Sequence, residues 1–133
     1  MHTYKCVVLV VDDNQTVAHW LAPLLEQSGD NAIAVNSGNE AIDLVAGRAV
    51  DMAVVDMQIP GIDALQTAVG ICNRVPHCRI ALISGHSESI EQVERATKEG
   101  LDFPVLAKPI SLAELLATLE ALCPAPMPQP LFR

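Results

Sequence analysis

The polar residues of this sequence that could do chemistry together each follow a short apolar run. They are the carboxylates Asp12, Asp13 and Asp56, the hydroxyl of Ser84 and the amine of Lys108. Neighbouring carboxylates repel one another, which costs stability unless a cation joins them. Oxygen ligands favour Mg2+ or Ca2+, and a lysine supplies a positive charge for a phosphate oxygen. Together these groups could bind a phosphoryl group beside a carboxylate nucleophile, which is the chemistry of an aspartyl phosphate.

Five apolar runs, with amphipathic stretches between them, predict the elements that position these groups. The runs lack the polar alternation of a half-exposed sheet, so we expect parallel strands buried on both faces. The expected strands are Cys6–Val11, Ala32–Val35, Met52–Val55, Ile80–Ile83 and Val105–Ala107, and the expected helices are Thr16–Gln27, Ser37–Ala46, Asp63–Arg74, Ser89–Glu99 and Ser111–Leu122. Right-handed crossovers then give a single doubly wound, five-stranded parallel α/β sheet with five helices on both faces. The carboxyl ends of its strands form one rim, where open parallel sheets bind ligands.

Local signals mark several of the expected helix ends. The pattern S-x-x-E, a capping box, opens two helices at Ser37 and Ser111. Gly29 and Gly100 lie just past two others, where a left-handed residue ends a helix. Pro23 falls inside the first expected helix, and we expect it to kink that helix or to shift its start.

The composition restricts the class of protein. The chain has 133 residues, which suits one domain, and only 3% are aromatic, so the core must be aliphatic. A net charge of −8 disfavours direct binding to nucleic acid. No signal peptide opens the chain, and no apolar run approaches the ~20 residues of a membrane span, so we expect a cytoplasmic protein with no membrane contact.

The cysteines are not spaced as metal ligands or as a redox pair. Cys6, Cys72, Cys78 and Cys123 form no C-x-x-C motif, and three of them lie in or beside apolar runs. We therefore expect buried free thiols.

Four motifs, in order along the chain, resemble the receiver domain of two-component response regulators. They are V-V-D-D-N (Val10–Asn14), V-V-D-M-Q-I-P-G-I-D (Val54–Asp63), I-S-G (Ile83–Gly85) and A-K-P-I (Ala107–Ile110). Each motif alone is weak, but the four in order at strand ends are specific. The resemblance covers residues 5–122, the expected receiver domain, and leaves a proline-rich tail over residues 123–133. It also implies the flavodoxin-like strand order 2-1-3-4-5, carried over from the family.

The resemblance implies how the rim holds metal and phosphate. Asp56 would be the phosphoacceptor and one of the Mg2+ ligands. Asp13 would bind Mg2+ directly, Asp12 would act mostly through water, and the backbone carbonyl of Gln58 would be a further ligand. The phosphoryl group would come from a phosphohistidine on a histidine kinase or a histidine phosphotransfer protein.

The resemblance also implies a switch. Lys108 would pair with one phosphoryl oxygen, and Ser84 would move to hydrogen-bond another. That movement would alter the surface of the fourth helix, fifth strand and fifth helix, which would bind a downstream effector protein or a second copy of the chain. Receivers usually carry Tyr or Phe at the position of Val105, so the aromatic part of the switch is absent unless Phe103 replaces it.

Two other functions fit parts of the same residue set. A degenerate receiver would act as a binding module without phosphate; the presence of all five site residues argues against it, and the missing aromatic keeps it open. A haloacid-dehalogenase-like phosphatase also forms an aspartyl phosphate with Mg2+, and Asp12-x-Asn14-x-Thr16 resembles its D-x-D-x-T motif. Its general acid would here be Asn14, which cannot transfer the proton, and its nucleophile would be Asp12 instead of Asp56. A receiver would not be an enzyme in the usual sense, because it catalyses only its own phosphorylation and dephosphorylation.

Overall fold

The apolar runs of the sequence form one parallel sheet in a computed structural model. The structure describes residues 6–13, 15–27, 29–59, 61–85, 93–94, 97–98, 100, 103–107 and 112–122. Its elements are β1 (Val7–Val11), α1 (Gln15–Gln27), β2 (Asn31–Val35), α2 (Gly38–Gly47), β3 (Met52–Asp56), α3 (Ala64–Arg74), β4 (Arg79–Ser84), β5 (Val105–Ala107) and α5 (Leu112–Leu122). The described residues of the expected helix Ser89–Glu99 are helical; they are Val93, Glu94, Thr97 and Lys98.

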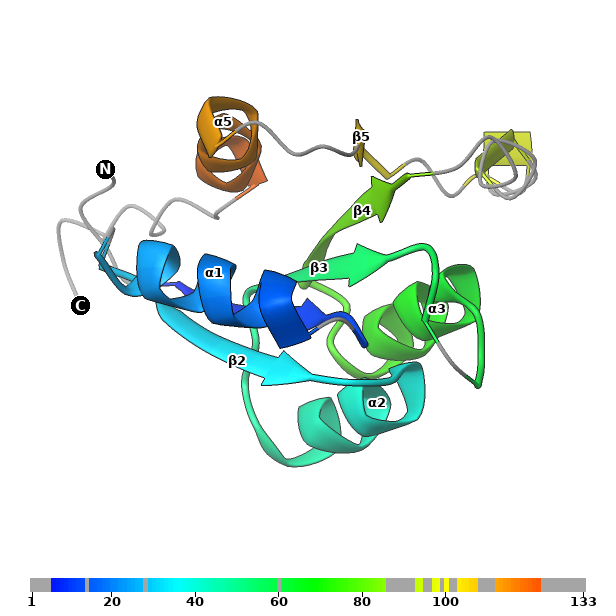
Figure 1. Cartoon of the computed structure of the whole chain (residues 1–133). Helices are drawn as coiled ribbons and strands as arrows, with labels where there is room; N and C mark the ends of the chain where they lie inside the picture. The colour runs from blue at the N-terminus through cyan, green and yellow to red at the C-terminus, as the bar shows by residue number, and fades with distance from the viewer. Residues whose placement is uncertain are drawn as a thin grey trace, which may run out of the picture.

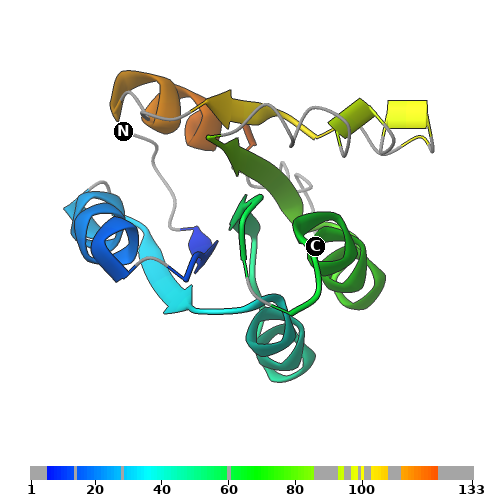
Figure 2. The same cartoon turned by 45° about the vertical axis from the view of Figure 1, so that its right-hand side comes forward.

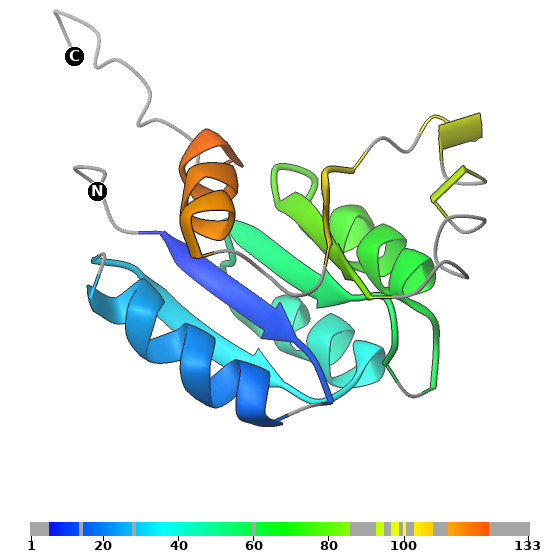
Figure 3. The same ribbon diagram turned by 45° about the horizontal axis from the view of Figure 1, so that its top comes forward.

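The strand order is β2-β1-β3-β4-β5, and every neighbouring pair is parallel (Figure 3). At the carboxyl end of β1, Val11 lies opposite Val35 of β2 and Val55 of β3. At the same end of β3, Asp56 lies opposite Ile83 of β4. The predicted fold class and strand order are therefore confirmed, and the register aligns the ends of the three central strands.

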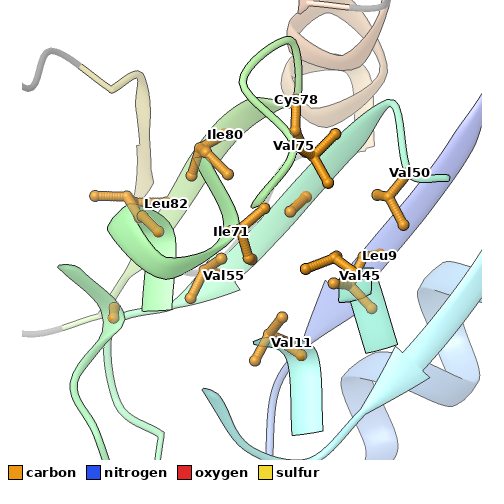
Figure 4. Close-up of a cluster of buried hydrophobic side chains, with 14 of the residues drawn as sticks. Leu9, Val11, Val45, Val50, Val55, Ile71, Val75, Cys78, Ile80 and Leu82 are labelled. Carbon is orange, nitrogen blue, oxygen red and sulfur yellow. The ribbon is translucent and has the colours of Figure 1, made fainter. Parts of the chain in front are cut away.

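Alternate strand residues face two different helical layers. One face packs on α2 and α3, and the other on α1 and α5 (Figures 1 and 2). The first cluster includes Leu9, Val11, Val55, Ile80 and Leu82 of the sheet with Val45 of α2 and Ile71 of α3 (Figure 4). The second includes Val8, Val10, Val54, Ile83 and Leu106 with Leu21 and Leu25 of α1 and Leu115 of α5. Because these strands are buried on both faces, their sequences are continuous apolar runs without polar alternation.

Side-chain caps fix the starts of α2 and α3. Ser37 Oγ accepts a hydrogen bond from the Glu40 N–H at 3.2 Å, and Glu40 Oε2 accepts one from the Asn36 N–H at 2.9 Å. Asp63 and Gln66 form a complete capping box, with donor–acceptor distances of 2.7 and 3.0 Å. The Ser37 cap confirms one half of the predicted capping box, whereas Glu40 accepts from the Asn36 N–H instead of the Ser37 N–H. The Asp63 box was not predicted, although its D-x-x-Q pattern is legible in the sequence.

The glycine caps also agree with the sequence. Gly29 has φ +95° and Gly100 has φ +84°, the left-handed conformation expected just past a helix. Helix α1 contains Pro23 and begins at Gln15, one residue earlier than predicted. The capping box predicted at Ser111 lies outside the described residues.

The expectation of free thiols is confirmed for Cys72 and Cys78 but is wrong for Cys6, which is disulfide-bonded. The partner of Cys6 lies outside the described residues. Sequence spacing could not reveal this bond, because the fold and not the local pattern determines which cysteines meet.

The part of the chain that the structure describes contains no helix long and apolar enough to cross a membrane.

Candidate functional site

Asp12 and Asp56 come side by side at the carboxyl edge of the sheet. Strands β1 and β3 pair as far as Val11 opposite Val55, and each aspartate is the next residue. The Asp12 N–H donates to the Val35 carbonyl at 3.1 Å, which ties the end of β1 to the end of β2. Both aspartates are almost fully buried, with 1% of Asp12 and 2% of Asp56 exposed. Two buried carboxylates at adjacent strand ends repel each other, and a cation between them would relieve that repulsion.

The backbone after β3 orients the Asp56 carboxylate. Asp56 Oδ1 accepts a hydrogen bond from the Gln58 N–H at 2.8 Å. The intervening residue is also fixed, because the Met57 N–H donates to the Ile83 carbonyl of β4 at 2.8 Å. A bond from an N–H to a carboxylate is charge-assisted and short. The turn that follows the strand therefore holds the carboxylate in one orientation.

Ser84 joins this edge from β4. It follows Ile83, the partner of Asp56, and lies opposite Ala107 of β5. Its side chain is partly buried. The structure thus brings Asp12, Asp56 and Ser84 to one edge, as predicted from the strand ends. Lys108, which directly follows Ala107 in the sequence, lies outside the described residues.

The buried acids fit a hard cation. Among the residues that the structure describes, no group of three or more His, Cys, Asp or Glu side chains is arranged to hold a metal ion. Mg2+ does not require such a group, since one or two carboxylates are enough when waters complete its shell. Asp12 and Asp56 supply two carboxylates, and the backbone carbonyl of Gln58 lies in the adjoining turn. Asp13 is exposed, and its role as a direct ligand stays a prediction.

Two residues that sequence reasoning did not connect with this edge support the loop after β3, which the structure describes at residues 57–59 and 61–63. Thr67 of α3 is fully buried, and its Oγ1 donates to the Asp63 carbonyl at 2.9 Å. Gly38, the first residue of α2, is buried against Thr67 and against Ile62 of the loop. A threonine in a helix and a glycine after a cap carry no local signal of this contact, because it joins segments distant in the sequence.

The predicted switch positions lie on β5 and just before it. Val105 is 40% exposed, whereas its neighbour Leu106 is 7% exposed and belongs to the second cluster. Phe103, two residues before Val105, is partly buried against the first cluster. The one aromatic residue near this position therefore contacts the core on the α2–α3 side of the sheet.

Comparison with known proteins identifies the family. The sequence matches the response regulator receiver domain over residues 8–120. The chain belongs to this family. The receiver is 31% identical over 115 residues to the transcriptional regulatory protein TctD of Salmonella typhimurium, a match that covers 86% of this chain and 50% of that protein. The chain thus spans about half the length of the curated relatives that it matches first.

Solved structures agree with this identification. A receiver domain from Clostridium thermocellum superposes with a TM-score of 0.79 at 24% identity, covering 89% of this chain and 94% of that one, which shows the fold. A response regulator from Burkholderia pseudomallei, solved with a phosphorylated aspartic acid, a calcium ion and citrate, gives a TM-score of 0.75 at 30% identity. It covers 86% of this chain and 66% of that one. The receiver is therefore a domain of two-component signalling.

Proposed function

We propose that this receiver accepts a phosphoryl group onto Asp56 with the help of Mg2+. The observation that carries the proposal is the burial of Asp56 beside Asp12 at the carboxyl edge, with Asp56 Oδ1 held by the Gln58 N–H at 2.8 Å. A carboxylate held in one orientation is ready to act as a nucleophile. The phosphorylated aspartic acid and the calcium ion in the Burkholderia regulator support the same chemistry here.

The phosphoryl group is transferred to Asp56 from a phosphohistidine on a histidine kinase or a phosphotransfer protein, and the transfer takes place in the cytoplasm. A carboxylate oxygen of Asp56 forms a bond to phosphorus while the bond from phosphorus to the imidazole nitrogen breaks, and that electron pair stays on the nitrogen. Asp13, Asp56 and the Gln58 carbonyl would hold Mg2+, with Asp12 acting through water, and the cation would supply positive charge for the transferring group. Lys108 pairs with a phosphoryl oxygen and adds a second positive charge.

The phosphorylated domain then changes its surface. The new group adds negative charge and three acceptor oxygens, and Ser84 moves to hydrogen-bond one of them. A shift from mostly off to mostly on needs about 5 kcal/mol of differential stabilisation, which charge-assisted hydrogen bonds of about 1.5–3 kcal/mol each can supply. The movement reaches β5 and α5, whose surface binds an effector protein or a second copy of the chain. With Val105 in place of the usual aromatic residue, the signal passes through backbone and helix movement.

Intact mass spectrometry tests the proposal. The wild-type chain is incubated with acetyl phosphate or phosphoramidate, with and without Mg2+, beside Asp56→Asn and Asp51→Asn. We expect one added phosphoryl group in the wild type and in Asp51→Asn, only with Mg2+, and none in Asp56→Asn. Absence of the added mass from the wild type under every condition would overturn the phosphorylation mechanism and favour a receiver that acts by contact alone.

A further inference from the structure

The loop after β3 is anchored at both of its ends, at Gln58 and at Asp63. At its start, the Gln58 N–H donates to Asp56 Oδ1 at 2.8 Å, so the loop and the phosphoacceptor carboxylate are directly linked. At its end, Asp63 caps α3, and the Asp63 carbonyl accepts hydrogen bonds from the Thr67 N–H and the Thr67 hydroxyl, both at 2.9 Å. A displacement near Asp63 therefore has only a few residues in which to be absorbed before it reaches the phosphoacceptor.

Helix α2 meets the loop at this second anchor. A Cβ atom placed on Gly38 would overlap Thr67 Oγ1 and would lie 2.7 Å from Ile62 Cγ1. Thr67 is fully buried, and its Oγ1 already donates to the Asp63 carbonyl, so it cannot rotate away without losing that bond. Ile62 belongs to the loop itself. A side chain at position 38 therefore has to displace either the loop or the hydrogen bond that anchors it.

A second contact joins the same two segments. Gly61 of the loop has φ +80°, a left-handed conformation that glycine adopts at little cost. A Cβ on Gly61 would lie 3.4 Å from Asn39 Nδ2 in the first turn of α2. The loop thus lies against the start of α2 at Gly61 and Ile62, while Thr67 of α3, which anchors the end of the loop, lies against Gly38.

We propose that Gly38 is a positioning residue for phosphoryl transfer. By carrying no side chain, it lets α2 support the loop after β3 at the place where the Gln58 carbonyl can bind Mg2+ and the Gln58 N–H can hold Asp56. The inference rests on the proposed function and deepens it. It adds a residue that touches neither metal nor phosphate but sets the position of the backbone group that does.

Gly70 provides a matched control within the same pair of helices. It lies on α3 and faces α2, and a Cβ there would lie 2.5 Å from Cδ1 and 2.9 Å from Cγ1 of Ile42. Gly70→Ala therefore crowds the contact between α2 and α3, as Gly38→Ala does. It does so against a flexible side chain of α2 and not against the loop. Both variants should destabilise the fold, but only Gly38→Ala should move the loop.

The test measures Mg2+ affinity by calorimetry, the initial phosphorylation rate as a function of Mg2+ concentration, and the amide NMR shift of Gln58 without phosphodonor. For Gly38→Ala we expect a weaker Mg2+ affinity by about tenfold, the scale seen when groups behind a metal ligand are disturbed, together with a shifted Gln58 amide. The maximal rate at saturating Mg2+ should change less than the affinity. Gly70→Ala should keep the wild-type affinity and the wild-type Gln58 shift.

Thr67→Val keeps the test decisive if Gly38→Ala does not fold. It removes the hydroxyl that donates to the Asp63 carbonyl and preserves the buried volume, so a smaller loss of Mg2+ affinity in the same direction is expected. Equal Mg2+ affinities and Gln58 shifts across wild type, Thr67→Val and the glycine variants would overturn the role of Gly38 and leave the proposed function intact. A wild-type chain that takes no phosphoryl group would instead overturn the proposed function, a failure visible before any variant is compared.

Discussion

Aspartates lie at both edges of the sheet, but the two edges use them differently. At the amino edge, Asp30 Oδ1 accepts from the Cys6 N–H at 3.0 Å, and Asp51 Oδ2 accepts from the Val7 N–H at 2.8 Å. These bonds join residues 24 and 44 positions apart. At the carboxyl edge, the Asp56 carboxylate accepts from Gln58, only two residues along the chain. The amino-edge carboxylates fasten strands together, whereas Asp56 is oriented by its own turn.

The difference shows how one residue type serves two purposes in one fold. A buried donor left without its acceptor costs stability, so the amino-edge aspartates stabilise the fold by the bonds they accept. Two neighbouring buried carboxylates repel each other, which lowers stability, and a bound cation reduces that cost. We therefore expect the amino edge to determine stability and the carboxyl edge to determine chemistry. The predictions below test that division, beginning with the largest effect.

The first prediction concerns the disulfide of Cys6, the residue that precedes β1 at the amino edge. Reduction should lower the free energy of unfolding by about 2–4 kcal/mol, because it releases a constraint on the unfolded chain. Thermal unfolding with and without a reductant measures the effect, and Cys6→Ser, which cannot form the bond, should not respond to the reductant. Titration of four free thiols in the unreduced, denatured chain would show that the bond does not form.

The Cys6 disulfide could not be predicted from the sequence, whereas most of the sheet could. The continuous apolar runs predicted the parallel sheet, because strands buried on both faces need no polar alternation. The ends of those runs correctly placed Asp12, Asp56 and Ser84 at one edge. The strand order came from the resemblance to receivers, since apolar patterns do not encode which strands are neighbours.

Contacts between distant segments escaped prediction for a related reason. Asp30 and Asp51 precede strands and look like surface acids, and nothing beside them in the sequence names a donor tens of residues away. Gly38 looks like an ordinary residue after a serine cap, although the fold places it against Thr67. The candidate site residues could be predicted because polar types are unusual directly after an apolar strand. The supporting residues could not, because their contacts join segments that are distant in the sequence.

The second prediction concerns the hydrogen bond that the Cys6 N–H donates to Asp30 at the amino edge. Asp30→Ala should lower the free energy of unfolding by about 1–3 kcal/mol, because the buried Cys6 N–H loses its acceptor. Asp30→Asn keeps an acceptor oxygen and should lose less. Urea unfolding measures both, and phosphorylation by acetyl phosphate should remain at the wild-type level in whatever fraction is folded. A stable Asp30→Ala chain that cannot be phosphorylated would show that the amino edge also determines the chemistry, contrary to the expected division of roles.

The third prediction is that a substitution at the carboxyl edge, Asp56→Asn, raises the stability instead of lowering it. Without Mg2+, Asp56→Asn should raise the free energy of unfolding by about 1 kcal/mol, the scale of single stabilising substitutions, because it removes one of two neighbouring buried charges. Adding Mg2+ should narrow the difference, since the cation stabilises the wild type more than the variant. Urea unfolding in EDTA and in excess Mg2+ measures both effects. Asp51→Asn serves as the control, and a gain in stability there equal to that of Asp56→Asn would remove any distinction between the edges.

The fourth prediction, whose effect is absent at neutral pH, concerns Cys78, which precedes β4 at the amino edge. Burial raises the pKa of the Cys78 thiol from its ordinary value of 9.0 to about 12, with smaller contributions from Cys72 and Asp51. Below pH 9 both the folded and unfolded forms keep this proton, so its contribution to stability is fully present. As the pH rises from about 9 towards 12, the unfolded thiol ionises first and stability falls, by at most about 1.4 kcal/mol per pH unit.

Cys78→Val isolates this contribution, because valine preserves an apolar side chain without a proton to lose. We expect the difference in unfolding free energy between wild type and variant to be constant below pH 9 and to shift in favour of the variant above it. Urea unfolding between pH 7 and pH 10.5 measures this difference, and a constant difference throughout would contradict the raised pKa. The same burial should make Cys78 react more slowly than the partly exposed Cys72 with a thiol reagent, since the thiolate is the reactive form. An ionisable group of the amino edge would then be held in its unreactive form by the packing that stabilises the sheet, whereas the carboxyl edge keeps Asp56 available for reaction.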